Sequence, residues 1–316
     1  MMYKNTFKLI FSNFNLVWKI LAYLIISSLC VIGLIYACSL PIVNVLQTEG
    51  VLPGIANLFT EFGTDFNVYK LLVDVVNTIE TFCIVIVENI SNLWIYVALL
   101  MAIIVFVRPL ICGFYKFATC NELYFYMSSN IKMGFTTSLF STFKTNLKFQ
   151  LCSFLVNCPI DLGLIVLFYF VAKWLISSSG LLLIAPILLI ALWCLLLALK
   201  VAIFAGWMPA IVAFDCGIWE GLKRGVKVVL RRFTRTFSTS ILVLMTLFIV
   251  NVIGAVCTFG ASLVVTFPLT LVSLLIFYMV VFYSSQGMRF YVDNTNVVTP
   301  QKMEETDGIN NLKYII

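Results

Sequence analysis

The chain has 316 residues, of which 62% are apolar and 11% are charged. Soluble domains have about 45–50% apolar and about 25% charged residues, so the composition excludes a water-soluble fold and indicates a membrane protein. The chain contains no His, which excludes a His general base and an imidazole metal ligand.

Six apolar stretches are long enough to span a bilayer, because a transmembrane helix needs about 20 mostly apolar residues. In chain order these stretches are 20–42, 93–115, 151–176, 181–206, 240–259 and 262–284. The sequence therefore predicts an all-α, polytopic membrane bundle of six transmembrane helices over residues 1–290. A polar cytoplasmic tail is expected at 291–316.

An acidic insert, residues 47–92, separates the first two predicted spans. Its acidic residues are Glu49, Glu61, Asp65, Asp74, Glu80 and Glu88, against one basic residue, Lys70. Apolar residues recur at helical spacing in its second half, from Leu72 to Ile90, with polar side chains opposite them. Because carboxylates in lipid are costly, we expect an outward amphipathic surface helix at about 69–91 and not a seventh span.

The basic residues predict the orientation, because short cytoplasmic loops collect Lys and Arg. With the N-terminus inside, every basic residue faces the cytoplasm except Lys70 and Lys173, which lie outside, and Arg108 and Lys200, which lie within spans. A seventh span would destroy this agreement. We therefore expect a multi-pass protein of the bacterial plasma membrane with both termini in the cytoplasm.

Three basic stretches that carry Asn, Thr and Phe lead into the odd-numbered spans. They are residues 6–26, 142–156 and 232–250. This pattern favours three repeated hairpins in series. The alternative is that a restricted apolar alphabet makes all lipid-facing stretches look alike.

Short motifs between residues 93 and 284 resemble two families of bacterial polytopic membrane proteins. PLICGFY at 109–115, followed by STFKTNLK at 141–148, resembles the first half of YesL-like proteins. MPAIVAF at 208–214, with GLKRG at 221–225 and RRFTRT at 231–236, is similar to both that family and the YciC-like membrane domains. The acidic insert departs from the YesL-like pattern. Because both families are largely without an assigned activity, the resemblance implies the architecture and little chemistry.

Four polar residues within the predicted spans form a candidate intramembrane site. They are Asp161, Arg108, Lys200 and Asn251. Asp161 leads because an ionisable residue in lipid is costly and marks a functional site by default. It could pair with Arg108 or Lys200 in a cation-coupled or proton-coupled transporter.

Each of these residues also has a structural interpretation. Asp161 would lie in the first turn of a helix that Pro159 opens and Asn157 caps. Arg108 and Lys200 would extend from the ends of their spans to the membrane surface. Asn251 would hydrogen-bond to a neighbouring helix.

The cytoplasmic segment 218–235 is predicted to be a basic amphipathic helix on the inner leaflet. Its apolar residues recur at helical spacing up to Phe233, with basic residues on the other side. The basic residues of the segment are Lys223, Arg224, Lys227, Arg231, Arg232 and Arg235. They form a candidate surface for anionic inner-leaflet lipids or for a membrane or cytoplasmic protein partner. The simpler alternative is that these charges only anchor the topology.

No motif for a cofactor, a metal or nucleic acid is found. The ten Cys include no Cys-x-x-Cys pair, and the chain has no glycine-rich phosphate loop. We therefore expect a non-enzymatic accessory or scaffold protein without cofactors. The alternatives are a small-solute or ion transporter that uses Asp161 and helices broken by Pro186 and Pro268, and a lipid-active enzyme.

Overall fold

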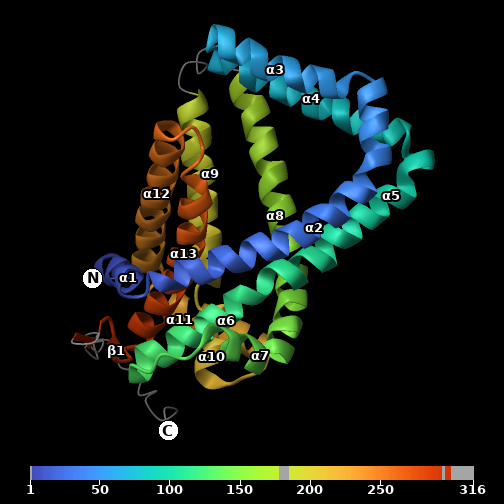
Figure 1. Ribbon diagram of the computed structural model, residues 1–316. Coiled ribbons are helices and arrows are strands. Elements are labelled where there is room, and N and C mark those ends of the chain that lie inside the picture. The colour runs from blue at the N-terminus through green and yellow to red at the C-terminus, as the bar shows by residue number, and fades with distance from the viewer. Residues whose placement is uncertain (1, 178–184, 294–295, 300–316) are drawn as a thin grey trace. The chain divides into compact units, whose positions relative to one another are not determined.

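The structure is a computed structural model that describes residues 2–177, 185–293 and 296–299 (Figure 1). The described residues are almost entirely helical, which confirms the predicted all-α fold. The first helices are α1 (Met2–Ser12), α2 (Asn15–Thr48), α3 (Val51–Asp65), α4 (Val68–Glu88), α5 (Ile90–Ala102), the π-helix η1 (Ile103–Val107) and α6 (Arg108–Ser129). They are followed by α7 (Phe135–Ser141), α8 (Phe143–Ser177), α9 (Ala185–Phe204), α10 (Trp207–Phe214), α11 (Ile218–Leu230), α12 (Phe233–Cys257) and α13 (Leu263–Gln286).

Six helical stretches of the described chain are long and apolar enough to cross a membrane. They are Asn15–Thr48, Ile90–Ser129, Phe143–Leu175, Ala185–Phe214, Phe233–Cys257 and Leu263–Gln286. These stretches match the six predicted spans, apart from residues 181–184, which lie outside the described residues. The chain is therefore a multi-pass membrane protein by the length and composition of its helices.

The chain divides into two compact units. Unit 1 contains Met1–Ile20, Lys116–Ser141 and Leu199–Ile316, and unit 2 contains Leu21–Tyr115 and Thr142–Ala198. Helices α2, α6 and α9 each contribute one part to each unit. The two units are described separately below.

The core of unit 1 is α13, whose side chains are buried almost without interruption from Val272 to Ser285. Helices α1, α10, α11 and α12 pack around it. The Tyr3 and Thr246 hydroxyls, from α1 and α12, lie 3.0 Å apart in a hydrogen bond. Unlike the predicted Pro-broken helix, α13 continues through Pro268. Pro186 is the second residue of α9.

The beginning of the predicted polar tail packs onto unit 1. Strand β1 (Phe290–Tyr291) pairs antiparallel with β2 (Val297–Val298), and Phe290 and Val292 are buried. The rest of the predicted tail, residues 300–316, lies outside the described residues.

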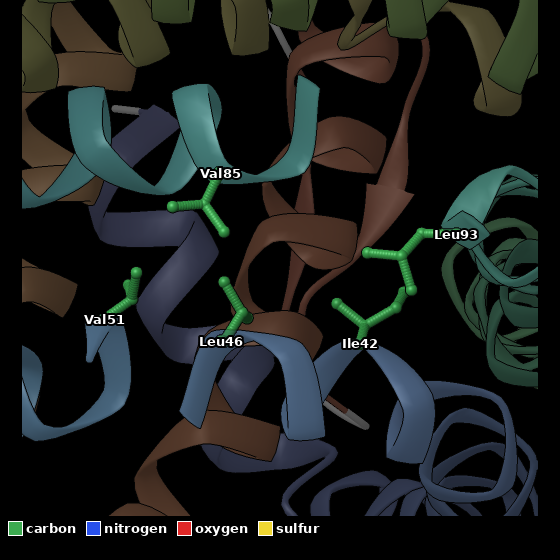
Figure 2. Close-up of a cluster of buried hydrophobic side chains, with 5 residues drawn as sticks. All are labelled: Ile42, Leu46, Val51, Val85 and Leu93. Atoms are coloured by element: carbon green, nitrogen blue, oxygen red, sulfur yellow. The ribbon is translucent and has the colours of Figure 1, made fainter. Parts of the chain in front are cut away.

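In unit 2 the acidic insert forms two helices, α3 and α4, which pack against each other (Figure 1). Helix α4 spans nearly the same residues as the expected amphipathic helix and is not among the membrane-spanning candidates of the described chain. Figure 2 shows how the insert joins its flanking spans, with buried apolar side chains from α2, α3, α4 and α5 in one cluster. These side chains are Ile42, Leu46, Val51, Val85 and Leu93.

The other side of unit 2 joins α4 to α8 and α9. Ala172 and Leu175 of α8 pack with Ala185 and Leu189 of α9, and Leu72 of α4 covers this cluster. Helix α4 therefore lies over neighbouring ends of α8 and α9.

A polar contact holds α8 against α6 inside unit 2. The side-chain amides of Asn146 and Gln150 donate to the carbonyl oxygens of Phe114 and Gly113, both at 2.7 Å. Tyr23 of α2 donates to the carbonyl of Ile111, one turn earlier on α6. In a bilayer, burying apolar side chains between helices gains little free energy, because the lipid tails are also apolar. Side-chain hydrogen bonds of this kind therefore help to hold transmembrane helices together.

Candidate functional site

Helices α10 and α11 form a tight hairpin in unit 1 that fixes which side of α11 is exposed. Gly206 and Gly225 meet at the crossing, where a Cβ added to either would lie 2.5 Å from the main chain of the other. The indole nitrogen of Trp207 donates to the carbonyl of Ile218 at 3.0 Å. The buried face of α11 consists of Gly221, Gly225, Val228 and Val229.

The outward face of α11 carries two parallel rows of side chains. The apolar row is Leu222, Val226 and Leu230, and the basic row is Lys223, Lys227 and Arg231, the residue that directly follows the helix. Each row has a spacing of four residues, so its members lie above one another on one side of the helix. Together the six side chains line a shallow, open groove on the surface of the hairpin.

Exposed apolar area accompanies the basic row. Leu230 is 57% exposed and Trp219, near the other end of the same face, is 53% exposed. Large apolar side chains cost free energy in water, so this face is suited to contact lipid or another protein. We name the groove residues together with Trp219 the α11 surface.

The structure divides the six predicted basic residues into three kinds. Arg224 donates to Glu220 at 2.5 Å and lies over the Phe214 ring, 5.5 Å from its centre. Lys223, Lys227 and Arg231 are exposed and make no ion pair with any described residue. The α11 surface therefore presents three cations that the described protein does not neutralise.

Arg232 and Arg235 belong to a different element, which corrects the predicted single helix over 218–235. Helix α11 ends at Leu230 and α12 begins at Phe233. Arg232 lies in the turn and donates to the carbonyl of Ser284 at 2.9 Å, which fixes the start of α12 against the end of α13. Burial, and then the nearby Arg235, lower the pKa of Arg232.

The interpretation of Asp161 as a helix-start residue is wrong. Helix α8 runs without interruption through Pro159, and the Asn157 side chain donates to Ser153, one turn earlier, instead of capping a new helix. Membrane helices tolerate Pro in this way because neighbouring groups satisfy the freed carbonyl.

Asp161 is half-buried near the middle of the third span. At 1.5 Å per residue it lies about 20 Å along α8 from Lys148 and about 18 Å from Lys173. The hydrocarbon layer is about 30 Å thick, so a helix that places both lysines near the surfaces holds Asp161 near the midplane. This depth is where an ionisable group is most costly.

The other predicted intramembrane residues lie on three further helices. Arg108, at the start of α6 in unit 2, is exposed, and Lys200, on α9 in unit 1, is half-buried. Asn251 of α12 donates to the Thr270 hydroxyl of α13 at 2.7 Å, which confirms its interpretation as a bond between helices.

Sequence reasoning missed an ion pair in unit 1. Lys19 of α2 and Glu122 of α6 lie 2.8 Å apart, and the second carboxylate oxygen of Glu122 is buried without a partner among the described residues. The available signal was that Glu122 is the only acidic residue between Glu88 and Asp161. The pair joins two spans by a charge-assisted hydrogen bond.

A second missed contact ties the insert of unit 2 to the third span. Glu80 of α4 accepts from Lys173 at 2.7 Å and from the Tyr169 hydroxyl at 2.6 Å, both on α8. These hydrogen bonds, from Lys173 first and then from Tyr169, lower the pKa of Glu80. We name this contact the Glu80 latch.

Comparisons of the chain with protein-family models, with curated proteins and with solved structures find no match. The geometry of the residues above is therefore the basis for any assignment. No group of three or more Cys, Asp or Glu in the described residues is arranged to hold a metal ion.

Proposed function

We propose that the protein is a non-enzymatic accessory or scaffold component of the bacterial plasma membrane, with both termini in the cytoplasm. The observation that carries this proposal is the α11 surface, where three unneutralised cations and exposed apolar side chains lie together on a rigid helical hairpin. A surface of this kind is suited to binding lipid or another protein at the membrane. The kinship of residues 93–284 with YesL-like and YciC-like proteins stays a prediction.

The amino-acid composition also supports an accessory or scaffold role. The chain has no His and no catalytic motif, and the three basic side chains lie in a shallow groove and not in an enclosed pocket that could exclude water. Catalysis depends on preorganised groups in a site shielded from water.

The scaffold role is tested by the size of the assembly that contains the protein in host membranes. Membranes that contain the wild type are solubilised in a mild detergent and separated on native gels. The wild type is expected to migrate at a larger apparent size than the purified chain. Replacing Lys223, Lys227 and Arg231 with Gln should remove the larger species. Replacing Lys4, Lys8 and Lys144, three exposed lysines outside α11, should leave it intact. A wild type that always runs as the purified chain contradicts the proposal.

A second candidate, an ion or small-solute transporter, is favoured by the depth of Asp161. A carboxylate near the midplane of a continuous span is typical of proton and cation pathways. The described structure removes the simplest competing explanation, because α8 does not begin at Pro159.

Proton flux into proteoliposomes tests this candidate. The vesicles contain a pH-sensitive dye, and a potassium diffusion potential is applied across their membranes. Proton flux is compared for wild type, Asp161→Asn and the control Asp74→Asn, which changes an acidic residue of the insert. Flux that Asp161→Asn alone abolishes would establish the transporter and overturn the scaffold proposal. Equal, background flux in all three would remove proton transport as a function.

A further inference from the structure

We propose that the α11 surface binds anionic phospholipid, with headgroups on the basic row and acyl chains along the apolar row. This inference rests on the proposed function, because it names what the same surface holds. Its first support is the match in chemistry. A phospholipid presents a phosphate next to a hydrocarbon chain, and the surface presents Lys223, Lys227 and Arg231 directly beside Leu222, Val226 and Leu230.

The second support is the continuity of the surface with a membrane-spanning helix. Only Arg231 and Arg232 separate the end of α11 from Phe233, where α12 begins. Arg232 is fixed to the carbonyl of Ser284 at the end of α13, another spanning helix. The Leu230 and Arg231 end of the surface therefore lies where the span enters the bilayer, at the depth of the headgroups.

The third support is the pattern of charge and aromatic side chains. The acidic residue of α11, Glu220, is occupied by Arg224, so the basic row keeps its full charge for an external anion. Trp219 extends the apolar row and is half-exposed. Tryptophan is enriched at the membrane interface, where its ring lies among headgroups.

A cytoplasmic protein could also use basic and apolar rows, but the position at the start of α12 favours lipid. A protein partner would have to displace headgroups from the Leu230 end. Lipid needs no displacement, because it already surrounds the spans. The two occupants give different results when the purified chain meets lipid alone.

The test uses quenching of Trp219 by brominated lipid in nanodiscs that contain the full-length chain. Emission of wild type minus that of Trp219→Phe isolates the signal of this residue. Phosphatidylglycerol with brominated acyl chains is expected to quench this signal more strongly than equally brominated phosphatidylcholine, and added salt should reduce the preference.

A single and a double variant of the same helix give the matched comparison. Lys227→Gln should lower the preference for phosphatidylglycerol about fivefold, since a basic residue near an anionic surface contributes about 1 kcal/mol. The double variant Glu220→Gln, Arg224→Gln should change it less than twofold, because it removes an ion pair and leaves the net charge of the surface unchanged. A triple variant at Lys223, Lys227 and Arg231 should remove the preference, while its thermal stability reports whether the hairpin remains folded.

Equal quenching by the two lipids, or equal effects of Lys227→Gln and the double variant Glu220→Gln, Arg224→Gln, would overturn the inference. If quenching shows no preference but the triple variant still dissolves the native assembly, the surface binds protein and only the lipid inference fails. If the lipid preference is found but no assembly exists, the scaffold proposal fails and the lipid site stands.

Discussion

Gly206 and Gly225 lie where the main chains of α10 and α11 come closest. A methyl group at either position would meet backbone atoms of the other helix at 2.5 Å, and backbone cannot move aside as a flexible side chain can. Overpacking of this kind costs about 1–3 kcal/mol. The α11 surface therefore depends on two glycines that touch no ligand themselves.

Gly225→Ala is expected to lower the midpoint of thermal unfolding of the purified protein and the lipid preference of Trp219 together, because the hairpin must separate. Gly163→Ala is the control, since Gly163 lies in α8 with nothing within 4 Å of an added Cβ. This change should be neutral or stabilise by up to about 1 kcal/mol, because Ala favours helices over Gly. If the two variants unfold at the same temperature, the close crossing does not limit stability.

Single residues were predicted with mixed success, for a physical reason. The bond from Asn251 to another helix was predicted because an amide within a span must find a partner. The helix start at Pro159 was wrong, because a rule from soluble helices was applied where membrane packing tolerates proline. The partners Lys19 and Glu122 were missed, since 103 residues separate them in the chain.

At the scale of elements, the Glu80 latch predicts a pH dependence in acid. The pKa of Glu80 is lowered in the folded protein, so its contribution to stability is present above the ordinary value of 4.5. The contribution is lost as the pH falls through the lowered pKa, where the carboxylate becomes protonated. The effect will be small, because exposed ion pairs contribute little and are screened by salt.

The measurement is the difference in unfolding midpoint between wild type and Glu80→Gln across pH 3 to 7. The difference should be largest near neutral pH and disappear in acid, where wild type also carries a neutral side chain. Glu88→Gln removes an exposed acid from the same helix and should give no such trend. A difference that is constant over the whole range would show that the latch does not titrate.

Elements were predicted best where one physical requirement dominates. The six spans follow from length and hydropathy, and α4 follows from its amphipathic spacing. Helix α3 was not predicted, although it is one of the two helices of the insert. The break between α11 and α12 was missed because the apolar spacing continues in phase to Phe233, so no local signal marks the turn at 231–232.

At the scale of the whole molecule, a chain that crosses the membrane six times is predicted to have its insert on the opposite side from both termini. The basic residues predict that the insert is outside. Thr64, exposed on α3, and Thr234, exposed at the start of α12, report the two sides.

In a background that lacks the exposed thiols of Cys30, Cys83 and Cys257, Thr64→Cys should react in intact cells with a maleimide that cannot cross membranes. Thr234→Cys should react only after the cells are permeabilised. The opposite pattern would reverse the orientation, and the α11 surface would then face the outside. Reaction of both in intact cells would require an even number of spans between them, in place of the three that the six-span arrangement has.

The Glu80 latch also has a consequence for biosynthesis. Glu80 is made 93 residues before Lys173, so the insert emerges on its side of the membrane long before its partner does. Tyr169 and Lys173 can bind Glu80 only after the third span has been inserted into the membrane. Helix α4 can then pack over the ends of α8 and α9. Until then Leu72 of α4 lacks its contacts with α8 and α9, because the chain that forms those helices has not yet been synthesised.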